Sequence, residues 1–451
     1  MIIIIGAGIT GLSAAYELTQ RHVPFVLLEA GSKPGGLIRT EHEDGFTIEL
    51  GADSILVQKP AALKLCEELG LSARLMASRR PRTAFILRDG RLHALPSPSV
   101  LGIPTTLPAL ARYSLIDWRT RARIAMEPLV PARTYADESV ASFFRRRFGA
   151  ATVDLIAEPL LGGIHAGDVE QLSMPSLFPR FTAAERQGGG VLRAVAPPAS
   201  GDGLFRALRS GMSELVEAIV HRLPAGSLLL ETPAAGIRRQ GSRWLVGAGG
   251  ERFEAAGLIL ATPAHVGATL LRTVDESAAN VCGTVPYVST ATVALGWRRA
   301  DVRHPLAGSG FVVARKHNTL RITACTWVSS KWESRAPDGM VLLRAFIGSV
   351  HDPHAADLGD AELIEIAVRE VSRVLGIGAP PVLGRAWRWR NAGAQHTVGH
   401  AARMTGLAAR LRSLPGLWVA GSGFESIGIP DCVANGRRVA TAAADYVRMG
   451  R

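Results

Sequence analysis

The N-terminal part of the chain alternates between short apolar runs and a helical pattern. Ile2–Ile5 are apolar at every position, which is typical of a parallel strand buried on both faces. After a glycine-rich turn, the spacing of apolar residues from Leu12 to Thr19 predicts a helix. A second apolar run, Phe25–Leu28, ends at Glu29. The order strand, helix, strand predicts a parallel sheet and an α/β fold.

The turn between the first strand and the helix carries a nucleotide-binding pattern. Its sequence is Gly6-Ala7-Gly8-Ile9-Thr10-Gly11, a GxGxxG motif in the expected context. The first glycine permits the tight turn, the second lets the backbone approach a pyrophosphate, and the third packs helix on strand. Glu29, followed by Ala30, stands where a carboxylate accepts a hydrogen bond from a ribose hydroxyl. Its charge would repel a 2′-phosphate, so we expect a dinucleotide without one.

A second glycine-rich stretch favours FAD over NAD. Gly35-Gly36-Leu37-Ile38-Arg39 and the later Gly51-Ala52-Asp53-Ser54 resemble the extension that follows this motif in the flavin amine oxidase superfamily. The resemblance implies that these residues lie along the FAD and that Arg39 bonds phosphate or flavin oxygens. The alternative for Arg39 is an ordinary surface arginine. The resemblance also implies that returning strands at Leu228–Glu231 and Leu258–Leu260 complete the FAD domain, and that the backbone of Ala234 contacts adenine.

The C-terminal part contains a strand, a glycine turn and a last helix. Leu417–Val419 reads as the strand, and it leads into the turn at Gly421. Ile427-Gly428-Ile429-Pro430-Asp431 then opens a helix that we expect to run to about Val447. The N-terminus of such a helix can stabilise negative charge on a reduced flavin. Asp431 is either an N-terminal helix carboxylate or a direct flavin contact.

Neither a second dinucleotide nor covalent attachment of FAD is expected. Gly247-Ala248-Gly249-Gly250 lies between two strand-like runs, which predicts a hairpin turn. Electrons should therefore leave the flavin for an acceptor other than bound nicotinamide. Covalent attachment needs a Cys or His, and the glycine turn offers Ser422 and Phe424 instead. We expect Cys432 to pack without a chemical role.

The composition excludes several classes of protein. The 451 residues are 47% hydrophobic and 20% charged, which excludes a disordered chain or a small disulfide-stapled domain. The four cysteines have no paired spacing, so we expect neither a disulfide scaffold nor a metal site, and a reducing compartment is favoured. The longest uncharged run, Ala94–Ala111, contains four prolines, so we expect no membrane-spanning helix.

The charge is strongly basic and unevenly distributed. The net charge is +12, and Ser72–Ala150 contain 14 Arg and no Lys against five acidic residues. Such an excess favours an anionic partner, although a genome rich in arginine codons is an alternative. No helix-turn-helix, zinc finger or base-stacking motif is present, so we do not expect nucleic acid as that partner.

Three further stretches make the resemblance specific. They are Gly162-Gly163-Ile164-His165-Ala166-Gly167-Asp168 with the following Leu172-Ser173 and Phe178-Pro179, then Gln395-His396-Thr397-Val398-Gly399-His400, and Gly428-Ile429-Pro430-Asp431-Cys432. With the N-terminal motif, they make the chain resemble the oxygen-dependent protoporphyrinogen oxidase family of haem biosynthesis over nearly its full length.

The resemblance implies a fold of three parts. It implies a Rossmann-type FAD domain of the p-hydroxybenzoate hydroxylase kind, an α+β substrate domain and a mainly helical, membrane-associating subdomain. We expect the FAD domain at residues 1–75, 204–275 and 405–451, and the substrate domain at 76–92, 190–203 and 276–404. The helical subdomain should occupy residues 93–189.

The resemblance also implies an activity. A porphyrinogen would lose six electrons in three rounds of hydride abstraction by flavin, each followed by reoxidation with O₂. Such a substrate is an apolar macrocycle with propionates, so it needs an apolar slot with cations at the rim. Some family members carry an Arg before the aromatic residue of a strand here, where this chain has Ala84 before Phe85, so Arg82, Arg79 or Arg88 is expected to substitute. We place Arg82 and Gly163 in the substrate site and nominate no catalytic base.

The choice of porphyrinogen stays open. Gly51-Ala52-Asp53-Ser54 is similar to the pattern of the coproporphyrinogen III oxidase branch, whereas Gly167–Ser173 resembles protoporphyrinogen oxidases equally well. Protoporphyrinogen IX is our first hypothesis and coproporphyrinogen III the alternative. We expect a cytoplasmic protein that can contact the inner face of the cell membrane.

One basic helix bears on that contact. In Ser139–Phe148, three Phe interleave with Arg145-Arg146-Arg147, and Phe144 and Phe148 should share a face. The helix is either an interfacial or propionate-collecting element, or a core-packed helix with a solvated basic face.

Three rival functions were weighed. An amine oxidase or desaturase is disfavoured because the glycine turn offers only Phe424, not paired aromatic residues. A nucleic-acid-binding protein lacks a supporting motif, and a flavin-bound scaffold without turnover is distinguished only by assay.

Overall fold

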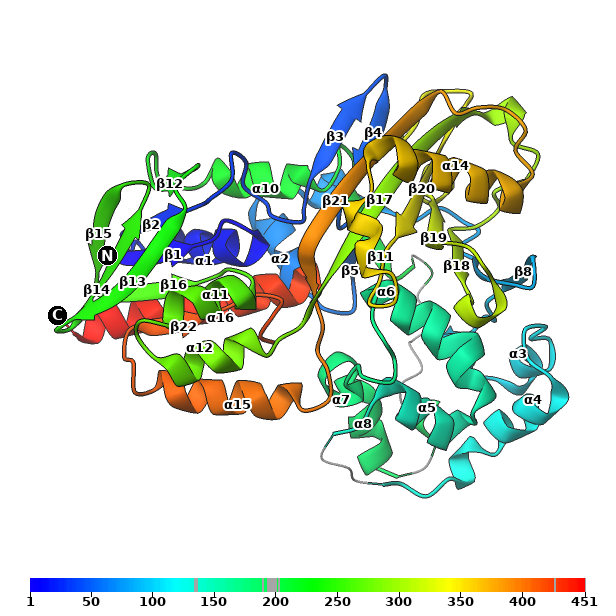
Figure 1. The fold of residues 1–451 in the computed structure, drawn as a ribbon, viewed down its shortest axis with the longest axis horizontal. Helices are drawn as coiled ribbons and strands as arrows, with labels where there is room; N and C mark the ends of the chain where they lie inside the picture. Colours follow the sequence, from blue (N-terminus) through cyan, green and yellow to red (C-terminus); the bar gives the residue numbers. More distant parts are fainter. Residues whose placement is uncertain (134–136, 189, 193–200, 202, 426, 451) are drawn as a thin grey trace.

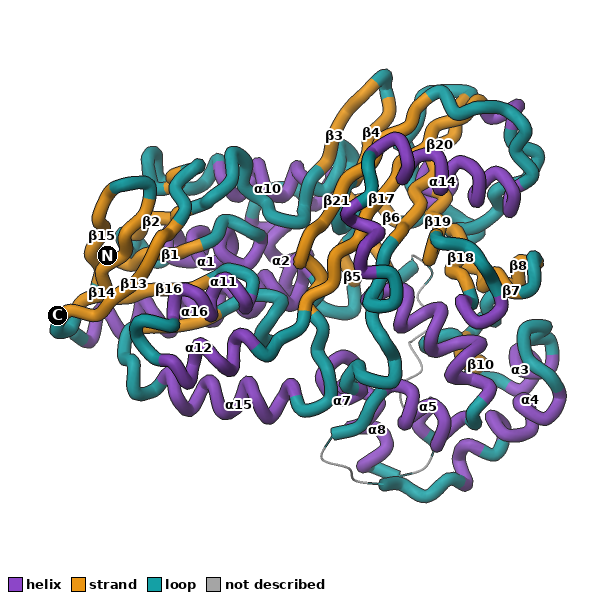
Figure 2. The backbone as a smooth tube through the Cα atoms, in the orientation of Figure 1, coloured by secondary structure: helices purple, strands orange, loops and turns teal. Residues whose placement is uncertain are grey.

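The computed structural model describes the chain except for residues 134–136, 189, 193–200, 202, 426 and 451. A parallel sheet with its helices forms one side of the molecule, and a larger sheet and a group of helices form the other (Figures 1 and 2). Residues 193–200 and 202, which belong to the expected substrate segment 190–203, lie outside the described part.

The parallel sheet has five strands in the order β12-β2-β1-β16-β22. They are Leu228–Leu229, Phe25–Leu28, Ile2–Ile5, Gly257–Leu260 and Leu417–Val419. Ile2 and Ile4 point into one core, and Ile3 and Ile5 into another, so every residue of β1 is buried. This two-sided burial explains why the strand is uniformly apolar.

Different elements cover the two faces. One core contains α1 (Ile9–Gln20), α2 (Ala61–Glu68), α10 (Ser213–Val220) and α16 (Ile429–Met449). The other contains the antiparallel strands β13 (Ala234–Gln240), β14 (Arg243–Ala248) and β15 (Glu251–Ala255), with α11 (Ala264–Leu271), α12 (Glu276–Gly283) and α15 (His400–Leu411). The turn between β14 and β15 holds Gly249 and Gly250, so the predicted hairpin is confirmed.

A seven-stranded mixed sheet has the order β21-β17-β20-β19-β18-β7-β8. Its strands are Leu383–Ala394, Tyr287–Arg298, Met340–Ile347, Ile322–Trp327, Gly310–Val313, Ala84–Arg88 and Arg91–Ala94. The amphipathic helix α14 (Asp360–Leu375) packs on this sheet through Leu363, Ala367 and Val371. Short turns η4 (Arg299–Asp301), η5 (Arg315–His317), η6 (Pro353–Asp357) and α13 (Val328–Lys331) connect its strands.

Small sheets connect the two sides. The strands β3 (Thr40–Glu43) and β4 (Phe46–Glu49) form a hairpin, and β11 (Phe205–Leu208) pairs with both β5 (Ile55–Leu56) and β6 (Leu75–Ala77). The 3₁₀ turn η1 (Ser72–Arg74) precedes β6. Segments far apart in sequence therefore meet between the parallel sheet and the large sheet.

Helices between residues 107 and 186 gather in the lower right of Figure 1. They are α3 (Leu107–Ala111), α4 (Trp118–Ala125), η2 (Glu127–Leu129), α5 (Val140–Phe148), η3 (Val153–Gly162), α6 (Gly163–His165), α7 (Met174–Leu177) and α8 (Pro179–Arg186), preceded by the hairpin β9 (Ser99–Val100) and β10 (Ile103–Pro104). The η3 segment is a π-helix that contains Pro159. π-Helical segments are often found at functional sites.

The structure corrects our prediction for the arginine run on α5. Phe143, Phe144 and Phe148 are fully buried, and the rings of Phe144 and Phe148 lie 5.3 Å apart. Arg147 is fully buried against Glu127, and Arg146 Nη1 lies 2.5 Å from Glu185 Oε1. The helix is core-packed, and its arginines are held by carboxylates, so neither a lipid-facing helix nor a fully solvated basic face is present.

Candidate functional site

The glycine turn has the geometry that the nucleotide-binding pattern requires. Gly6 has a φ of +100°, and a Cβ there would come within 2.6 Å of the carbonyl oxygen of Ala261. A Cβ on Gly11 would meet the oxygen of Gly6 at 1.9 Å, so only glycine lets α1 pack this closely on β1. A Cβ on Gly8 would meet nothing within 4 Å, because this position faces open space at the start of α1.

Glu29 is held at the end of β2 by backbone groups. Its Oε2 accepts a hydrogen bond from Ala7 N at 2.7 Å and its Oε1 accepts one from Gly31 N at 2.8 Å. A carboxylate can accept about four hydrogen bonds, so acceptor capacity remains for ribose hydroxyls.

A cavity of about 610 Å³ extends from this turn. The predicted cofactor residues that line it are Gly6, Gly8, Ile9, Thr10, Glu29, Ala30, Gly36, Leu37, Ala52, Ala234, Gly421, Ile427 and Ile429. Ala7 and Gly11 lie behind the lining, where they shape the turn. Segments that are far apart in sequence thus converge on one elongated cavity.

The residues of this cavity fit a flavin dinucleotide. The N-terminus of α1 presents backbone N–H groups at the turn, as pyrophosphate binding requires. Within the described residues, Arg39 Nε and Thr262 Oγ1 are buried without a hydrogen-bond partner, and Thr262 lines the cavity. Both atoms could bond a polar ligand, which agrees with the prediction for Arg39 as a cofactor contact.

Sequence analysis missed several lining residues. Tyr287, Trp389 and His265 line the cavity from β17, β21 and α11. The Tyr287 hydroxyl accepts a hydrogen bond from Ala264 N at 2.8 Å, and the Trp389 indole donates to Leu50 O at 2.9 Å. Strand pairing brings them to the cavity, and no local motif marks them.

A second cavity of about 710 Å³ adjoins the first. Ala52, Ile427 and Ile429 line both cavities. The second cavity also contains the other predicted residues Gly51, Asp53, Ser54, Gly428, Arg82 and Gly163. Gly51, Asp53, Ser54 and Gly428 were predicted as cofactor contacts, but the structure places them on the side of the second cavity.

The walls of the second cavity are largely apolar. They include Phe85, Leu160, Ile164, Phe311, Val312 and Phe346. Of the three arginines proposed to replace the one missing at Ala84, only Arg82 lines this cavity. Arg88 instead lies 3.0 Å from Asp89, and Arg79 lines a separate surface pocket.

A charged cluster lies at one end of this cavity. Asp53 Oδ2 is 3.1 Å from Lys331 Nζ and 3.3 Å from Arg344 Nη2, and its Oδ1 accepts a hydrogen bond from Ser54 Oγ at 2.7 Å. Burial alone would raise the pKa of the Asp53 carboxyl, but the charges of Lys331 and Arg344 outweigh burial and hold this pKa well below its usual range. Asp53 is therefore an anion at neutral pH.

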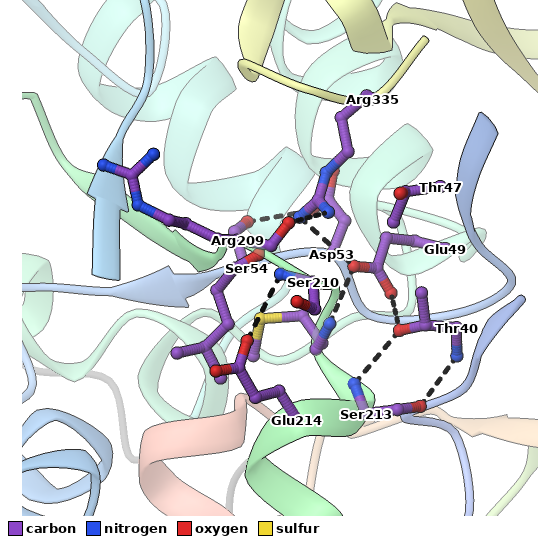
Figure 3. A network of polar contacts seen from close by, with 12 residues as sticks. Thr40, Thr47, Glu49, Asp53, Ser54, Arg209, Ser210, Ser213, Glu214 and Arg335 are labelled. Atoms are coloured by element: carbon purple, nitrogen blue, oxygen red, sulfur yellow. Dashed lines mark hydrogen bonds and ion pairs between the residues drawn. The ribbon is translucent and has the colours of Figure 1, made fainter. Parts of the chain in front are cut away.

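A buried polar network fixes the segment that carries Asp53 (Figure 3). Glu49 accepts hydrogen bonds from Met212 N and Thr40 Oγ1, each at 2.8 Å. Arg335 Nη2 lies 3.5 Å from Glu49 and donates to Leu208 O at 2.8 Å. Burial raises the pKa of Glu49, although Arg335 opposes that shift. This network connects the hairpin β3–β4, the strand β11 and the large sheet.

Arg344 holds the same segment from the cavity side. Its Nη1 donates to Glu49 O at 2.8 Å and to Gly51 O at 3.0 Å. The backbone between the two cavities is therefore positioned by one nearly buried guanidinium.

Two histidines fix the glycine turn at the C-terminal end. The rings of His396 and His400 are stacked with centroids 3.9 Å apart. Their Nε2 atoms bond Ser422 O at 2.8 Å and Phe424 O at 3.1 Å. Burial lowers the pKa of both rings, and lowers that of His400 to about 4. The motif that carries them is thus a support for the Gly421 turn.

The start of α16 separates two earlier alternatives for Asp431. Its Oδ2 lies 2.6 Å from Lys59 Nζ, and Asp431 is not among the residues that line either cavity. It is therefore an N-terminal helix carboxylate. Cys432 lines the first cavity, and burial raises the pKa of its thiol to about 11, so the thiolate form is rare at neutral pH.

Within the described residues, no helix is long and apolar enough to cross a membrane.

Comparisons with known proteins identify the family. The family model described as flavin containing amine oxidoreductase matches residues 9–444. The coproporphyrinogen III oxidase of Bacillus subtilis is 34% identical over 465 residues, covering 99% of this chain and 98% of that protein. The chloroplastic protoporphyrinogen oxidase 1 of Arabidopsis thaliana is 26% identical, covering 99% and 88%. A crystal structure from Exiguobacterium sp. 255-15, provisionally named protoporphyrinogen oxidase, has a TM-score of 0.87 at 31% identity, with 98% of each chain covered. The chain belongs to the flavin containing amine oxidoreductase family.

Proposed function

We propose that this protein is an FAD-dependent porphyrinogen oxidase of haem biosynthesis. The observation that carries this proposal is the contact between the two cavities at Ala52, Ile427 and Ile429. A substrate in the second cavity would lie against the end of a dinucleotide in the first. FAD, when bound, supplies the hydride acceptor.

The residues of the second cavity suit a macrocycle with acidic side chains. Its apolar walls can hold the ring in one plane and exclude water, while Arg82 and Lys331 offer cations to propionates. No residue is assigned as a base, and the contribution of the chain is orientation and charge.

Two porphyrinogens remain candidates. Protoporphyrinogen IX is the first hypothesis, and one relative bears that activity in its name. Coproporphyrinogen III is favoured by the names of the relatives from Bacillus subtilis and Staphylococcus aureus, which are 34% and 30% identical to this chain.

One experiment compares the two. The FAD-loaded protein is given each porphyrinogen separately, and porphyrin fluorescence and O₂ uptake are recorded. Formation of a fluorescent porphyrin with O₂ consumption supports the proposal. A flavin-loaded protein that oxidises neither substrate contradicts it, and porphyrin formation without O₂ uptake contradicts the proposed acceptor.

We also propose that the helical region contacts an anionic membrane surface from the cytoplasmic side. The supporting surface is an apolar stripe on α4 and η2. Trp118, Met126 and Leu129 are 70%, 50% and 80% exposed, and the exposed Arg119 lies beside Trp118. Aromatic and basic side chains on one helix face are typical of helices that lie at a lipid interface.

A further inference from the structure

The second cavity continues into a smaller chamber. The chamber has a volume of about 220 Å³, and Gly163 lines both spaces. Neighbouring residues line first one and then the other. They are Leu160 and Pro159 on the π-helix, Val312 and Val313 on β18, and Ala324 and Thr323 on β19.

The chamber lies at the opposite end of these strands from the Asp53 cluster. On β19 the lining runs from Thr326 in the large cavity to Thr323 in the chamber, which is about 10 Å along the strand. This length is comparable with the width of a tetrapyrrole ring. A ring that contacts Lys331 at one edge would therefore bring its other edge to the chamber.

Two arginines at the chamber keep donors for a ligand. Arg321 contacts Asp352 through Nε and Nη2, and within the described residues its Nη1 makes no hydrogen bond. Arg315 lies 3.2 Å from Glu158 through Nε alone. Both side chains are slightly more than one-third exposed, so a ligand can reach them. A guanidinium with two remaining N–H groups can bind a carboxylate.

Glu158 is the group that opposes an anion in this chamber. Its Oε2 is buried without a hydrogen-bond partner among the described residues. A carboxyl that faces a bound carboxylate is stable there when it carries the proton between them. The other titratable groups at the chamber are His351, which stays neutral at pH 7 because burial lowers its pKa, and Asp352, which is occupied by Arg321.

We propose that Arg315 and Arg321 form a second carboxylate-binding subsite, which selects ring substrates with carboxylates on two opposite edges. This proposal rests on the proposed porphyrinogen oxidase function. The cations at Lys331 and Arg82 would bind one edge and the chamber the other. A tetracarboxylate ring would use both ends, and a dicarboxylate ring with its acids on one edge would use one.

The test measures binding of stable porphyrins to the FAD-loaded protein by fluorescence. The variants are Arg315→Gln, Arg321→Gln and Arg321→Lys, and the probes are coproporphyrin III and protoporphyrin IX. The matched control is Lys316→Ala on the same turn, because Lys316 lies 2.6 Å from Asp154 and does not line the chamber. Retained FAD absorbance shows that each variant is folded.

The expected result is a loss confined to one probe. Each Gln variant should weaken coproporphyrin III binding roughly tenfold or more and protoporphyrin IX binding by less than about twofold, with Arg321→Lys intermediate. Glu158→Gln should preserve or strengthen coproporphyrin III binding, since it removes an opposing carboxyl. Equal weakening of both probes, no weakening, or a loss in Glu158→Gln would overturn the subsite.

Failure of the subsite differs from failure of the function. If the unmodified protein oxidises a porphyrinogen but the variants do not discriminate between the probes, only the subsite is wrong. If it binds neither porphyrin and oxidises neither porphyrinogen, the proposed function itself fails.

Discussion

At the scale of single residues, the glycines of the nucleotide turn have separable roles. Gly6 and Gly11 are required by the protein's own backbone, since a Cβ on either would overlap a carbonyl oxygen. Gly8 has no such neighbour, so its lack of a side chain serves the ligand.

Gly8→Ala should therefore fold and bind FAD poorly. We expect the dissociation constant for FAD to rise about tenfold or more, because the added methyl occupies the approach of the pyrophosphate. Titration of the apoprotein with FAD measures this. The control is Gly406→Ala on α15, where a Cβ also meets nothing and FAD affinity should not change. Equal FAD affinity in Gly8→Ala and the unmodified protein would contradict the assignment.

Asp53 should stabilise the fold as an anion. Its pKa is depressed in the folded state, so its contribution is present above the unfolded value, about 3.9, and is lost as the pH falls through the folded value. We expect Asp53→Asn to cost about 2–3 kcal/mol in urea unfolding between pH 5 and pH 8, with the difference shrinking below about pH 4. The exposed Asp338→Asn should show no such difference. A pH-independent difference down to pH 3 would argue against ion pairing.

At the scale of elements, the arginines of α5 differ although they are adjacent in sequence. Arg147 is fully buried with Glu127 and near Glu185, whereas Arg145 and its partner Glu170 are each about half exposed. A buried pair that loses one partner leaves an uncompensated charge, and an exposed pair contributes little.

Arg147→Ala should destabilise the protein by about 3–5 kcal/mol, since Glu127 and Glu185 would remain buried. Arg145→Ala should change stability by less than about 1 kcal/mol. Denaturant unfolding compares the two variants directly. Similar effects would show that the depth of burial does not decide the contribution of these ion pairs.

The apolar stripe on α4 and η2 leads to a vesicle-binding test. We expect the double variant Met126→Glu and Leu129→Glu to lose most binding to vesicles that contain an anionic lipid, with FAD retained. Co-sedimentation measures this. Met449→Glu is the control, because Met449 is 81% exposed at the far end of α16. Arg145→Glu should leave binding unchanged. Vesicle binding that survives the double variant would exclude the stripe as the contact.

At the scale of the whole molecule, the two sheets are joined by buried polar groups. Glu49 and Arg335 link β4, β11 and the large sheet, and His396 and His400 link the large sheet's last strand to the Gly421 turn. These contacts set the position of one cavity relative to the other.

The buried histidines should make this assembly sensitive to acid. Their folded pKa values are lowered, so the unfolded chain binds protons more readily and stability falls as the pH drops from about 6.5 towards 4. For His400 the loss reaches about 3 kcal/mol at most. His400→Asn should show a shallower decline in urea unfolding over this range. An identical pH dependence in both proteins would contradict this explanation.

The amino-acid sequence determined the local features of this protein. The strands β1, β2, β16 and β22, the glycine turn, the hairpin after β14 and the last helix follow from periodicity, and the structure has them with bounds that differ by a few residues. Leu228–Glu231 was predicted as a strand and is paired only at Leu228–Leu229, because its neighbour β2 offers partners to those two residues alone. The apolar runs were informative because burial on both faces leaves no polar position in the pattern.

Only the tertiary structure decided which residues meet. Tyr287 and Trp389 reach the first cavity through strand pairing, Lys331 and Arg344 reach Asp53 from positions about 280 residues later, and Arg147 is buried by carboxylates on other helices. The charge of an arginine run is visible in sequence, but its partners are not, since ion pairs form between elements whose packing depends on the whole core. The basic segment therefore became a set of buried and partly exposed pairs, and the apolar stripe beside it became the surface to test.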